Sequence, residues 1–266
     1  MIAVEENAVY PVLFTVAGWE IRSYTVFLCL GILAGLLAGW GEARRIGYGW
    51  RRIAAFMLFV LPLALGLGLV NGWLFNPDFY TALAHSRVAL RGGLISFGAL
   101  VGAFLAGGLF ARVVHEPLGR GTDPIALVLP LVLGITRIGC LLNGCCFGRE
   151  AEGFGTLYLP GRFGVWADRY PTQLILMVFD FLLFAWLWKR RTVKPYEGDL
   201  TVSFLLWFSL IRLVVDGLRD LPVLFLGLSL HQVFAAVTLL CMAALALIIR
   251  ALAAGPRASR RRTRPD

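Results

Sequence analysis

Charged side chains are scarce in this sequence, and their scarcity excludes an ordinary soluble domain. Only 15% of the 266 residues are charged and 59% are hydrophobic, with a mean hydropathy of +0.77. A soluble globular domain is about a quarter charged and about half apolar. The chain is therefore expected to lie in a membrane, where a single bundle of this length has room for roughly six to eight spanning helices.

Three further features are missing. Residues 1–6 hold two acids and no basic residue, so the start lacks the charge pattern of a cleavable signal peptide, and the first apolar span is expected to stay in the mature protein. Five cysteines are too few and too unevenly placed for a disulfide scaffold. The sequence shows no convincing internal repeat, which disfavours an inverted-repeat transporter.

Apolar runs, separated by charged or Gly/Pro-rich breaks, indicate seven membrane spans. They are predicted at residues 22–40, 53–75, 94–113, 125–143, 172–188, 199–216 and 232–252. We therefore expect an all-α fold, in the form of a polytopic membrane helix bundle.

Basic residues are divided unevenly between the two sides of this bundle. Assigning the first, third and fifth breaks and the C-terminal end to one side gives that side 16 basic residues and the other side 7. By the positive-inside rule, the N-terminus is expected outside and the C-terminus in the cytoplasm. The net charge of +9 does not predict a nucleic-acid partner, because the basic residues are scattered between apolar runs instead of gathered on one soluble face.

The chain is expected to form one domain. Residues 1–255 make the transmembrane bundle, and two long outer segments, 76–93 and 147–170, carry Pro, Gly, aromatic and charged residues instead of a spanning pattern. These segments are predicted to cap the outer face. Residues 256–266 are dense in arginine and are predicted to form a disordered, basic cytoplasmic tail near anionic headgroups.

Several charged residues fall inside the predicted spans, where each costs roughly 2.5 to 3.5 kcal/mol on insertion scales. Arg137 lies in the outer half of the fourth span, Arg212 and Asp216 in the outer half of the sixth, and Asp180 about midway along the fifth. Arg212 and Asp216 are four residues apart, so they can pair on one helix face. Asp180 has two open interpretations, as a partner for an arginine or as a hydrogen-bonding group between helices.

Arg137 has no partner at helical spacing, so a second arginine in the same outer cavity favours an anionic ligand over a purely structural ion pair. Guanidinium suits phosphate because its planar fork donates two parallel hydrogen bonds. The pattern therefore predicts a phospholipid-headgroup site. A small transporter is an alternative, but its charges are expected to continue through the inner halves of the spans.

The cysteines fall into two groups. Cys29 and Cys241 lie within apolar runs and are expected to pack as small hydrophobes, whereas Cys140, Cys145 and Cys146 are clustered at the end of the fourth span. On an oxidising outer face, two of the clustered cysteines can form a disulfide; simple packing and a reactive thiol are the alternatives. No metal is predicted, because the spacing is not C-x-x-C and no second cluster exists.

The charged segments also resemble a known family. Residues 134–149 resemble the G-R-x-G-N-x-x-N-x-E-x-x-G-R signature of the prolipoprotein diacylglyceryl transferases. Five residues agree with that signature: Arg137, Gly139, Asn143, Gly148 and Arg149.

Shorter segments resemble other elements of the same family. Residues 91–94 are similar to its H-G-G-L element, and residues 171–174 to its H-P-S/T-Q-L element. Residues 21–24 resemble I-R-x-Y, residues 212–220 resemble R-x-x-x-E-x-x-R-x-x-D, and Gln232 fits the glutamine that opens the last span. The matches follow the family order over most of the chain.

The resemblance implies an enzyme of the bacterial inner membrane. Such enzymes transfer the diacylglyceryl group of phosphatidylglycerol to the lipobox cysteine that follows a prolipoprotein signal peptide. Membrane lipids are further partners, and no cofactor is implied. The predicted catalytic residues are Tyr24, Arg91, Arg137 and Arg212. The predicted substrate-binding residues are Arg137, Asn143, Gly148, Gln173, Arg212 and Asp216.

Departures from the family pattern fall at positions that are expected to matter. The histidine of H-G-G-L, a proposed general base, is Arg91 here, and arginine stays protonated. Cys140 and Cys145 replace an asparagine and an acid of the signature. Arg91 is then expected to bind phosphate, with deprotonation assisted by Tyr24, His85 or His231. The alternative is a paralogue with a different acceptor, or a non-catalytic phospholipid-binding protein.

Overall fold

The computed structural model describes residues 10–16, 18–75, 93–160, 165–221, 223–225 and 227–260. Within these ranges the chain is mostly helical. The α-helices are α1 (Ser23–Arg45), α2 (Trp50–Phe75), α4 (Gly93–Val113), α5 (Leu118–Leu142), α6 (Thr172–Arg190), α7 (Asp199–Val215) and α8 (Leu230–Arg260). A 3-10 turn, η1 (Asp216–Leu218), follows α7 directly.

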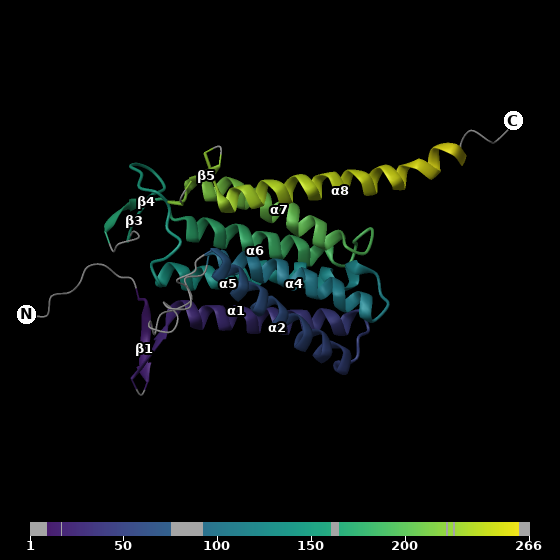
Figure 1. The fold of residues 1–266 in the computed structure, drawn as a ribbon, viewed down its shortest axis with the longest axis horizontal. Coiled ribbons are helices and arrows are strands. Elements are labelled where there is room, and N and C mark those ends of the chain that lie inside the picture. Colours follow the sequence, from purple (N-terminus) through teal and green to yellow (C-terminus); the bar gives the residue numbers. More distant parts are fainter. Residues whose placement is uncertain are drawn as a thin grey trace, which may run out of the picture.

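The helices lie side by side in one bundle (Figure 1). α5 packs against α1, α4, α6 and α7, while α2 pairs with α4 and α7 pairs with α8. One buried cluster between α5, α6 and α7 includes Leu127, Leu187 and Phe204, and another between α2, α4 and α5 includes Val60 and Ala106. Because α5 contacts four other helices, side chains at the end of α5 lie near the ends of several helices.

Small residues let α4 and α5 approach closely. Gly107 of α4 faces Gly121 of α5, and a Cβ built on Gly121 would lie 2.0 Å from the Gly107 carbonyl oxygen. Any larger residue at Gly121 would push the two backbones apart. Close packing through small residues is how membrane helices associate without a hydrophobic force between them.

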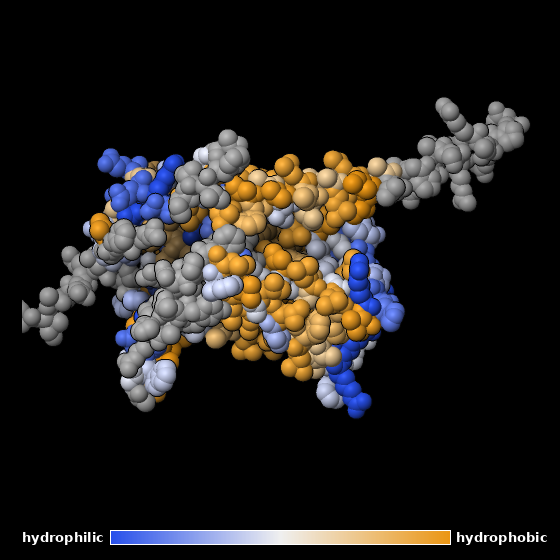
Figure 2. All heavy atoms as spheres, viewed as in Figure 1, coloured by the Kyte–Doolittle hydropathy of each residue, from blue (hydrophilic) through white to orange (hydrophobic). Residues whose placement is uncertain are grey.

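The surface of the bundle is that of a membrane protein. Six described helices, α1, α2, α5, α6, α7 and α8, contain segments that are long and apolar enough to cross a membrane, and α4 has a shorter apolar stretch at Gly98–Val113. Figure 2 shows an apolar band with hydrophilic residues toward its two ends. Large side chains such as Leu58 are exposed within this band. The protein is therefore a multi-pass helical membrane protein.

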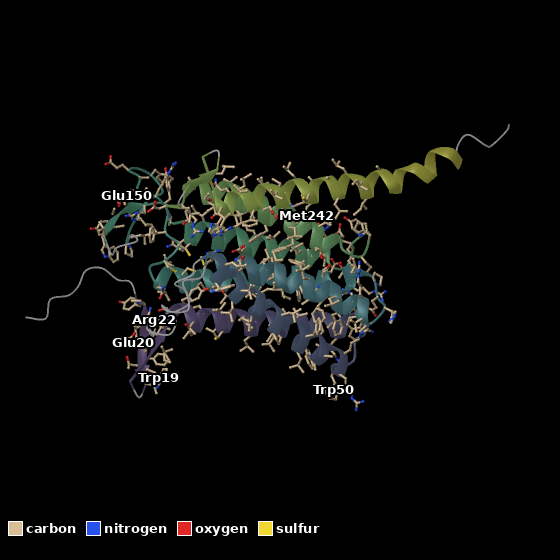
Figure 3. The ribbon with its side chains drawn as sticks, in the orientation of Figure 1. Trp19, Glu20, Arg22, Trp50, Glu150 and Met242 are labelled. Carbon is tan, nitrogen blue, oxygen red and sulfur yellow. The ribbon has the colours of Figure 1, made fainter. Side chains whose placement is uncertain are left out.

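Exposed tryptophans lie at opposite ends of the bundle (Figure 3). Trp19 precedes α1, and Trp50 begins α2; both side chains are exposed. Tryptophan is enriched at the two membrane–water interfaces because its ring is apolar and its N–H is polar. These two residues are therefore consistent with a bundle whose length matches the membrane.

Three β-hairpins correct the all-α prediction. They pair β1 (Val12–Val16) with β2 (Trp19–Arg22), β3 (Leu157–Pro160) with β4 (Trp166–Arg169), and β5 (Val223–Phe225) with β6 (Leu228–Ser229). All three lie at the same end of the bundle, which we call the hairpin end (Figure 1). With two to five residues each, the strands are too short to produce a recognisable alternating pattern.

Helix boundaries differ from the predicted spans mainly at the opposite end. There α1 continues to Arg45 and α5 begins at Leu118, so both helices are longer than predicted. α8 continues to Arg260, so it includes residues 256–260 of the predicted basic tail. Of the two predicted cap segments, 147–170 contains the β3–β4 hairpin, and 76–92 lies outside the described residues.

A buried carboxylate ties two helices together at the end opposite the hairpins. Asp123 of α5 accepts hydrogen bonds from the backbone N–H groups of Gly198 and Thr201, both at 3.0 Å, and from the Thr201 hydroxyl at 2.9 Å. The Lys194 ammonium donates to it at 2.9 Å. The first N–H groups of a helix have no partner within the helix. Asp123 therefore satisfies the start of α7 from a neighbouring helix.

Candidate functional site

An ion-paired group of three residues lies at the end of α7. Arg212 Nη2 is 2.9 Å from Asp216 Oδ2, and Arg219 Nη1 is 3.2 Å from Asp216 Oδ1. Arg212 and Asp216 are 5% and 2% exposed, so the pair is buried. The predicted pairing of Arg212 with Asp216 is confirmed. Since one carboxylate faces two guanidinium groups, this group carries a positive charge.

Arg137 reaches the same end of the bundle from α5. Its Nη1 lies 4.0 Å from the Cys140 sulfur, and its charge interacts with those of Asp180 and Asp216. Among the described residues, Arg137 forms no ion pair within 4.0 Å, and its buried Nε has no hydrogen-bond partner. Arg137 is therefore a half-buried cation whose buried Nε has unused donor capacity.

The balance of charge at this end favours an anion. Asp180, buried on α6, interacts electrostatically with both Arg137 and Arg212. Three guanidinium groups and two carboxylates sum to +1 when all five groups are ionised. A buried charge without a counter-charge is unfavourable. One phosphate group would neutralise the excess and use the free donor of Arg137.

Gly139 brings the start of α1 against α5. A Cβ built on Gly139 would lie 2.8 Å from Phe27 Cβ and 3.0 Å from Tyr24 Cα, so only glycine allows this approach. As a result the Tyr24 phenol lies within electrostatic range of Arg137 and Cys140. The structure thus brings Tyr24, a predicted catalytic residue, to the buried arginines.

A tight loop after α5 gathers three thiols. The Cys145 N–H donates to the Cys140 carbonyl at 3.0 Å, and Gly144 and Cys146 have φ values of +63° and +62°. A left-handed φ is strained for a residue with a side chain, so the surroundings must hold Cys146 in place. The three sulfur atoms lie within 4.8 Å of one another, and none of these cysteines is in a disulfide.

The first turn of α6 holds this loop. The Thr172 hydroxyl donates to the Cys146 carbonyl at 2.8 Å, and the Gln173 side-chain amide donates to the Cys145 carbonyl at 2.8 Å. Both donors are buried. Gln173, a predicted substrate-binding residue, therefore positions the loop, while its Oε1 has no hydrogen-bond partner among the described residues.

Cys146 is the thiol of this loop that ionises most readily. Hydrogen bonds from Cys140 and Cys145 hold the pKa of the Cys146 thiol well below its usual range, against the effect of burial, and nearby Arg219 and Arg137 act in the same direction. Hydrogen bonds with the other two thiols, together with burial, raise the pKa of Cys145.

Asn143 and Gly148 flank the cysteine loop. Asn143 ends α5, and its buried Oδ1 has no hydrogen-bond partner among the described residues, so it remains available to a ligand. The Gly148 N–H donates to the Tyr170 carbonyl at 3.1 Å, and a Cβ on Gly148 would lie 2.4 Å from that oxygen. Gly148 thus packs closely against Tyr170 with its N–H already bonded, and its substrate-binding role stays a prediction.

The remaining predicted residues differ in whether the structure describes them, and two residues near the site were not predicted. Arg91 and His85 lie outside the described residues. His231, buried at the start of α8, interacts electrostatically with Arg212. Neither Arg219 nor Thr172 is among the predicted site residues. The spacing of Arg219, three residues after Asp216 on a helical turn, is a signal that could have identified it.

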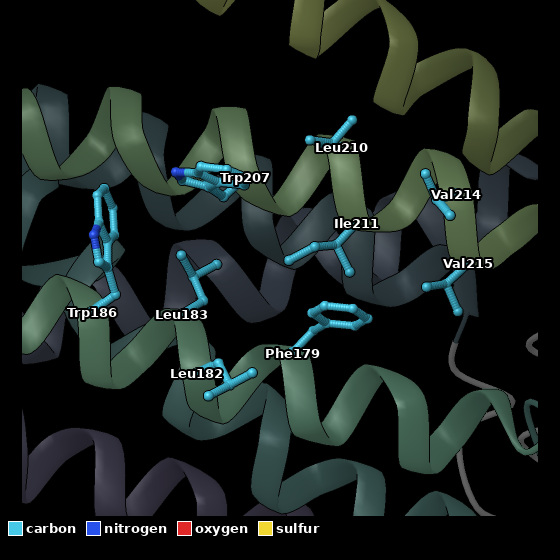
Figure 4. Close-up of a pocket in the computed structure, with 9 residues that line it drawn as sticks. All are labelled: Phe179, Leu182, Leu183, Trp186, Trp207, Leu210, Ile211, Val214 and Val215. Carbon is cyan, nitrogen blue, oxygen red and sulfur yellow. The ribbon is translucent and has the colours of Figure 1, made fainter.

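An apolar groove runs between α6 and α7 (Figure 4). Phe179 and Trp186 line it from α6, and Trp207, Val214 and Val215 line it from α7. Trp186 and Trp207 lie at one end, with ring centroids 6.4 Å apart, and the two valines lie at the other. The stretch of α7 that forms the groove also carries Arg212. The groove can therefore accommodate a hydrocarbon chain beside the buried charges.

Comparisons with known proteins agree with these features. A family model described as prolipoprotein diacylglyceryl transferase matches residues 11–249. A phosphatidylglycerol–prolipoprotein diacylglyceryl transferase of Clostridioides difficile (strain 630) is 29% identical over 226 residues, which cover 84% of this chain and 88% of the relative. A protein of the same name from Pediococcus pentosaceus is 28% identical and covers 85% of each chain. One from Dehalococcoides mccartyi is 26% identical, covering 86% of this chain and 89% of the relative. The match spans most of the bundle, and the chain therefore belongs to the prolipoprotein diacylglyceryl transferase family.

Proposed function

We propose that this protein transfers the diacylglyceryl group of phosphatidylglycerol to the thiol of the lipobox cysteine of a prolipoprotein. The relatives are named for this activity. The observation that carries the proposal is the excess of positive charge at the hairpin end, where the half-buried Arg137 joins the Arg212–Asp216–Arg219 group. Guanidinium groups bind phosphate in a bidentate manner, so this group fits a phospholipid headgroup.

In the proposed reaction, the acceptor thiolate attacks the glyceryl carbon that carries the phosphate ester. A carbon–sulfur bond forms and the carbon–oxygen bond breaks, with its electron pair leaving on the oxygen of glycerol phosphate. Negative charge grows on the departing phosphate, and Arg137 and Arg212 stabilise it in a site with little water. The acceptor thiol must first lose its proton, because the thiolate is the nucleophile.

The groove between α6 and α7 is the proposed place for one acyl chain. Its lining is entirely apolar or aromatic, from Phe179 and Leu182 on α6 to Ile211 on α7. Val215 also lines the groove and lies three residues after Arg212, on the same side of α7. A lipid with its phosphate at Arg212 can therefore lay a chain along this surface.

Other predicted site residues take supporting roles in this proposal. Asn143 Oδ1 and Gln173 Oε1 are buried acceptors that suit hydroxyl groups of the glycerol headgroup. Asp216 orients Arg212, and Tyr24, which interacts electrostatically with Arg137, is the proposed group that assists proton movement. Arg91, as a third phosphate ligand, stays a prediction.

We also propose seven membrane spans, with α4 as the seventh, in the bacterial inner membrane. In this arrangement residues 1–255 form one bundle, the hairpin end faces outward, and residues 256–266 lie in the cytoplasm. The division of basic residues, 16 against 7, supports this orientation. It places the buried arginines in the outer half of the membrane, beside the outer leaflet.

Reporter fusions test the orientation. A reporter that is active only in the periplasm is expected to be active when fused after Gly153, in the outer segment, and inactive when fused after Arg262. A reporter that is active only in the cytoplasm should give the reverse pattern. Periplasmic activity of the fusion after Arg262 would refute the proposed topology.

Incorporation of labelled lipid tests the function directly. The full chain, purified in detergent, is expected to transfer label from the diacylglyceryl part of phosphatidylglycerol to a lipobox peptide. The same peptide with serine in place of its cysteine is the control and should stay unlabelled. The chain should also complement a strain depleted of its own transferase. Intact phosphatidylglycerol binding without labelling or complementation would rule out the transferase function.

A second candidate function is favoured by one observation, the arginine at position 91 where the family pattern has a histidine. Arginine cannot accept the proton of a thiol. On this reading the protein keeps the lipid-binding bundle and transfers to another acceptor, or binds phospholipid without catalysis. Labelling of a membrane component other than the lipobox peptide would identify this case.

A further inference from the structure

Three thiols at the hairpin end take no part in the proposed binding of phosphatidylglycerol. The sulfur atoms of Cys140, Cys145 and Cys146 lie within 4.8 Å of one another, at the end of α5 and in the loop that follows. Cys140 is buried, whereas Cys145 and Cys146 are half-buried, so one side of the cluster remains open. A disulfide uses two sulfur atoms and does not explain the third.

The geometry of the cluster suits a thiophilic divalent cation. Zinc binds thiolate sulfur at about 2.3 Å, so three sulfur atoms around a tetrahedral ion are about 3.8 Å apart. Sulfur atoms already within 4.8 Å of one another reach that separation by small side-chain rotations. Sites with three protein ligands leave the fourth position of the ion open to a substrate.

The surroundings of the cluster also suit such an ion. Three thiolates and a divalent cation carry a net charge of −1, and Arg137 Nη1 lies 4.0 Å from the Cys140 sulfur. Arg219 interacts electrostatically with Cys146 and adds a second positive charge. The loop is held before any ion arrives, because Thr172 and Gln173 bind its carbonyl oxygens at 2.8 Å. Groups that fix ligands in this way strengthen metal binding.

We propose that Cys140, Cys145 and Cys146 bind one divalent cation of the zinc class, and that the open fourth position takes the thiol of the acceptor cysteine. This inference rests on the proposed function and adds to it a means of activating the acceptor. The cluster lies beside Arg137, so an acceptor sulfur held there is next to the proposed phosphate site.

A thiol bound to such a cation loses its proton, which passes to water. The bound sulfur then attacks the glyceryl carbon of phosphatidylglycerol. The carbon–sulfur bond forms as the carbon–oxygen bond breaks, and glycerol phosphate leaves with the electron pair. The product is a thioether, which is neutral and binds the cation weakly, so it can leave. Charge and atoms balance without an oxidant or a further reactant.

This step accounts for three departures from the family pattern together. Arg91 cannot serve as a base, and two signature positions are occupied by Cys140 and Cys145. A cation that lowers the pKa of its bound thiol removes the need for a basic side chain. Arg91 thus removes one means of activating the thiol, and Cys140 and Cys145 supply another.

Cobalt(II) is the probe for the site, because it takes tetrahedral thiolate positions and its absorption reports them. The full chain, reduced and purified in detergent, is expected to bind one equivalent of Co²⁺ with a thiolate-to-cobalt charge-transfer band, and Zn²⁺ should displace it. Each of the variants Cys140→Ser, Cys145→Ser and Cys146→Ser should weaken binding by more than the roughly 10- to 100-fold that loss of a ligand-orienting residue costs. A variant with both Cys29→Ser and Cys241→Ser is the matched control and should bind Co²⁺ as the parent does.

Two further measurements separate this inference from the proposed function. A lipobox peptide should change the visible spectrum of the bound Co²⁺, whereas the peptide with serine in place of cysteine should not. Removal of metal by a chelator should lower transfer at least about 100-fold, as expected for loss of thiol activation, with phosphatidylglycerol binding unchanged. Melting of every variant in detergent, measured alongside, identifies any that fails to fold.

The possible results lead to different conclusions. No stoichiometric Co²⁺ binding by the reduced parent, or a disulfide within the cluster that persists after reduction is attempted, overturns the inference. Full transfer by metal-free protein also overturns it and leaves the proposed function intact. A metal-loaded protein that binds the peptide thiol and phosphatidylglycerol, yet transfers nothing, supports the site and refutes the proposed function.

Discussion

Replacement of Arg137 by glutamine is expected to slow diacylglyceryl transfer about 100- to 1,000-fold, the usual effect of removing one donor that stabilises transition-state charge. Binding of phosphatidylglycerol should weaken as well. The fold should survive, because Arg137 has no ion pair within 4.0 Å among the described residues and its buried Nε is unbonded. Both effects are measured by initial rates of lipid labelling and by lipid titration in detergent.

Arg120→Gln is the matched control for this substitution. Arg120 lies on the same helix, α5, but at the opposite end, where its exposed side chain is 3.5 Å from Glu197. Its loss should leave transfer unchanged, since exposed ion pairs contribute little. Arg137→Lys should recover only part of the activity, because a point charge lacks the bidentate fork. Equal rates for Arg137→Gln and Arg120→Gln would refute the phosphate site.

The largest loss of stability is expected from Asp123→Ala. Asp123 is 2% exposed and accepts hydrogen bonds from Gly198, Thr201 and Lys194, which join α5 to the start of α7. Alanine would leave two buried N–H groups and one ammonium without this partner. Breaking a buried charged pair costs about 3 to 5 kcal/mol. Unfolding in mixed detergent should show this loss as an earlier transition.

Asp168→Ala provides the control for that experiment. Asp168 lies on β4 at the hairpin end and is exposed, so the same substitution should change the free energy of unfolding by no more than about 0.5 kcal/mol. Transfer per folded molecule should be similar for both variants, because Asp123 lies at the end opposite the site. A similar loss of stability in both variants would contradict the structural role of Asp123.

Features that depend on residues near one another in the sequence could largely be predicted. Each predicted span overlaps an observed helix. A spanning helix needs about 20 consecutive, mostly apolar residues, and such a run can be recognised in the sequence. The Arg212–Asp216 pair could be predicted from a separation of four residues on one helix. The resemblance to the transferase family, carried by segments such as 134–149, is confirmed by the match over residues 11–249.

The hairpins, and the close approach of all three clustered thiols, could not be predicted in the same way. The β5–β6 hairpin has strands of three and two residues, which are too short to show a period. The three thiols meet because Gly144 and Cys146 turn the loop through left-handed conformations and because Thr172, 26 residues further on, holds it. Neither cause appears in the spacing of the cysteines.

The sequence by itself determined that the chain is a helical membrane protein with charges in its spans, since backbone groups in lipid must bond within each segment. Only the tertiary structure decided which charges meet. Arg137, Asp180 and Arg212 lie on α5, α6 and α7, and their approach depends on side chains that pack between those helices, not on their spacing in the chain. Packing between helices is a property of the whole bundle, and for that reason the site itself could be placed only in three dimensions.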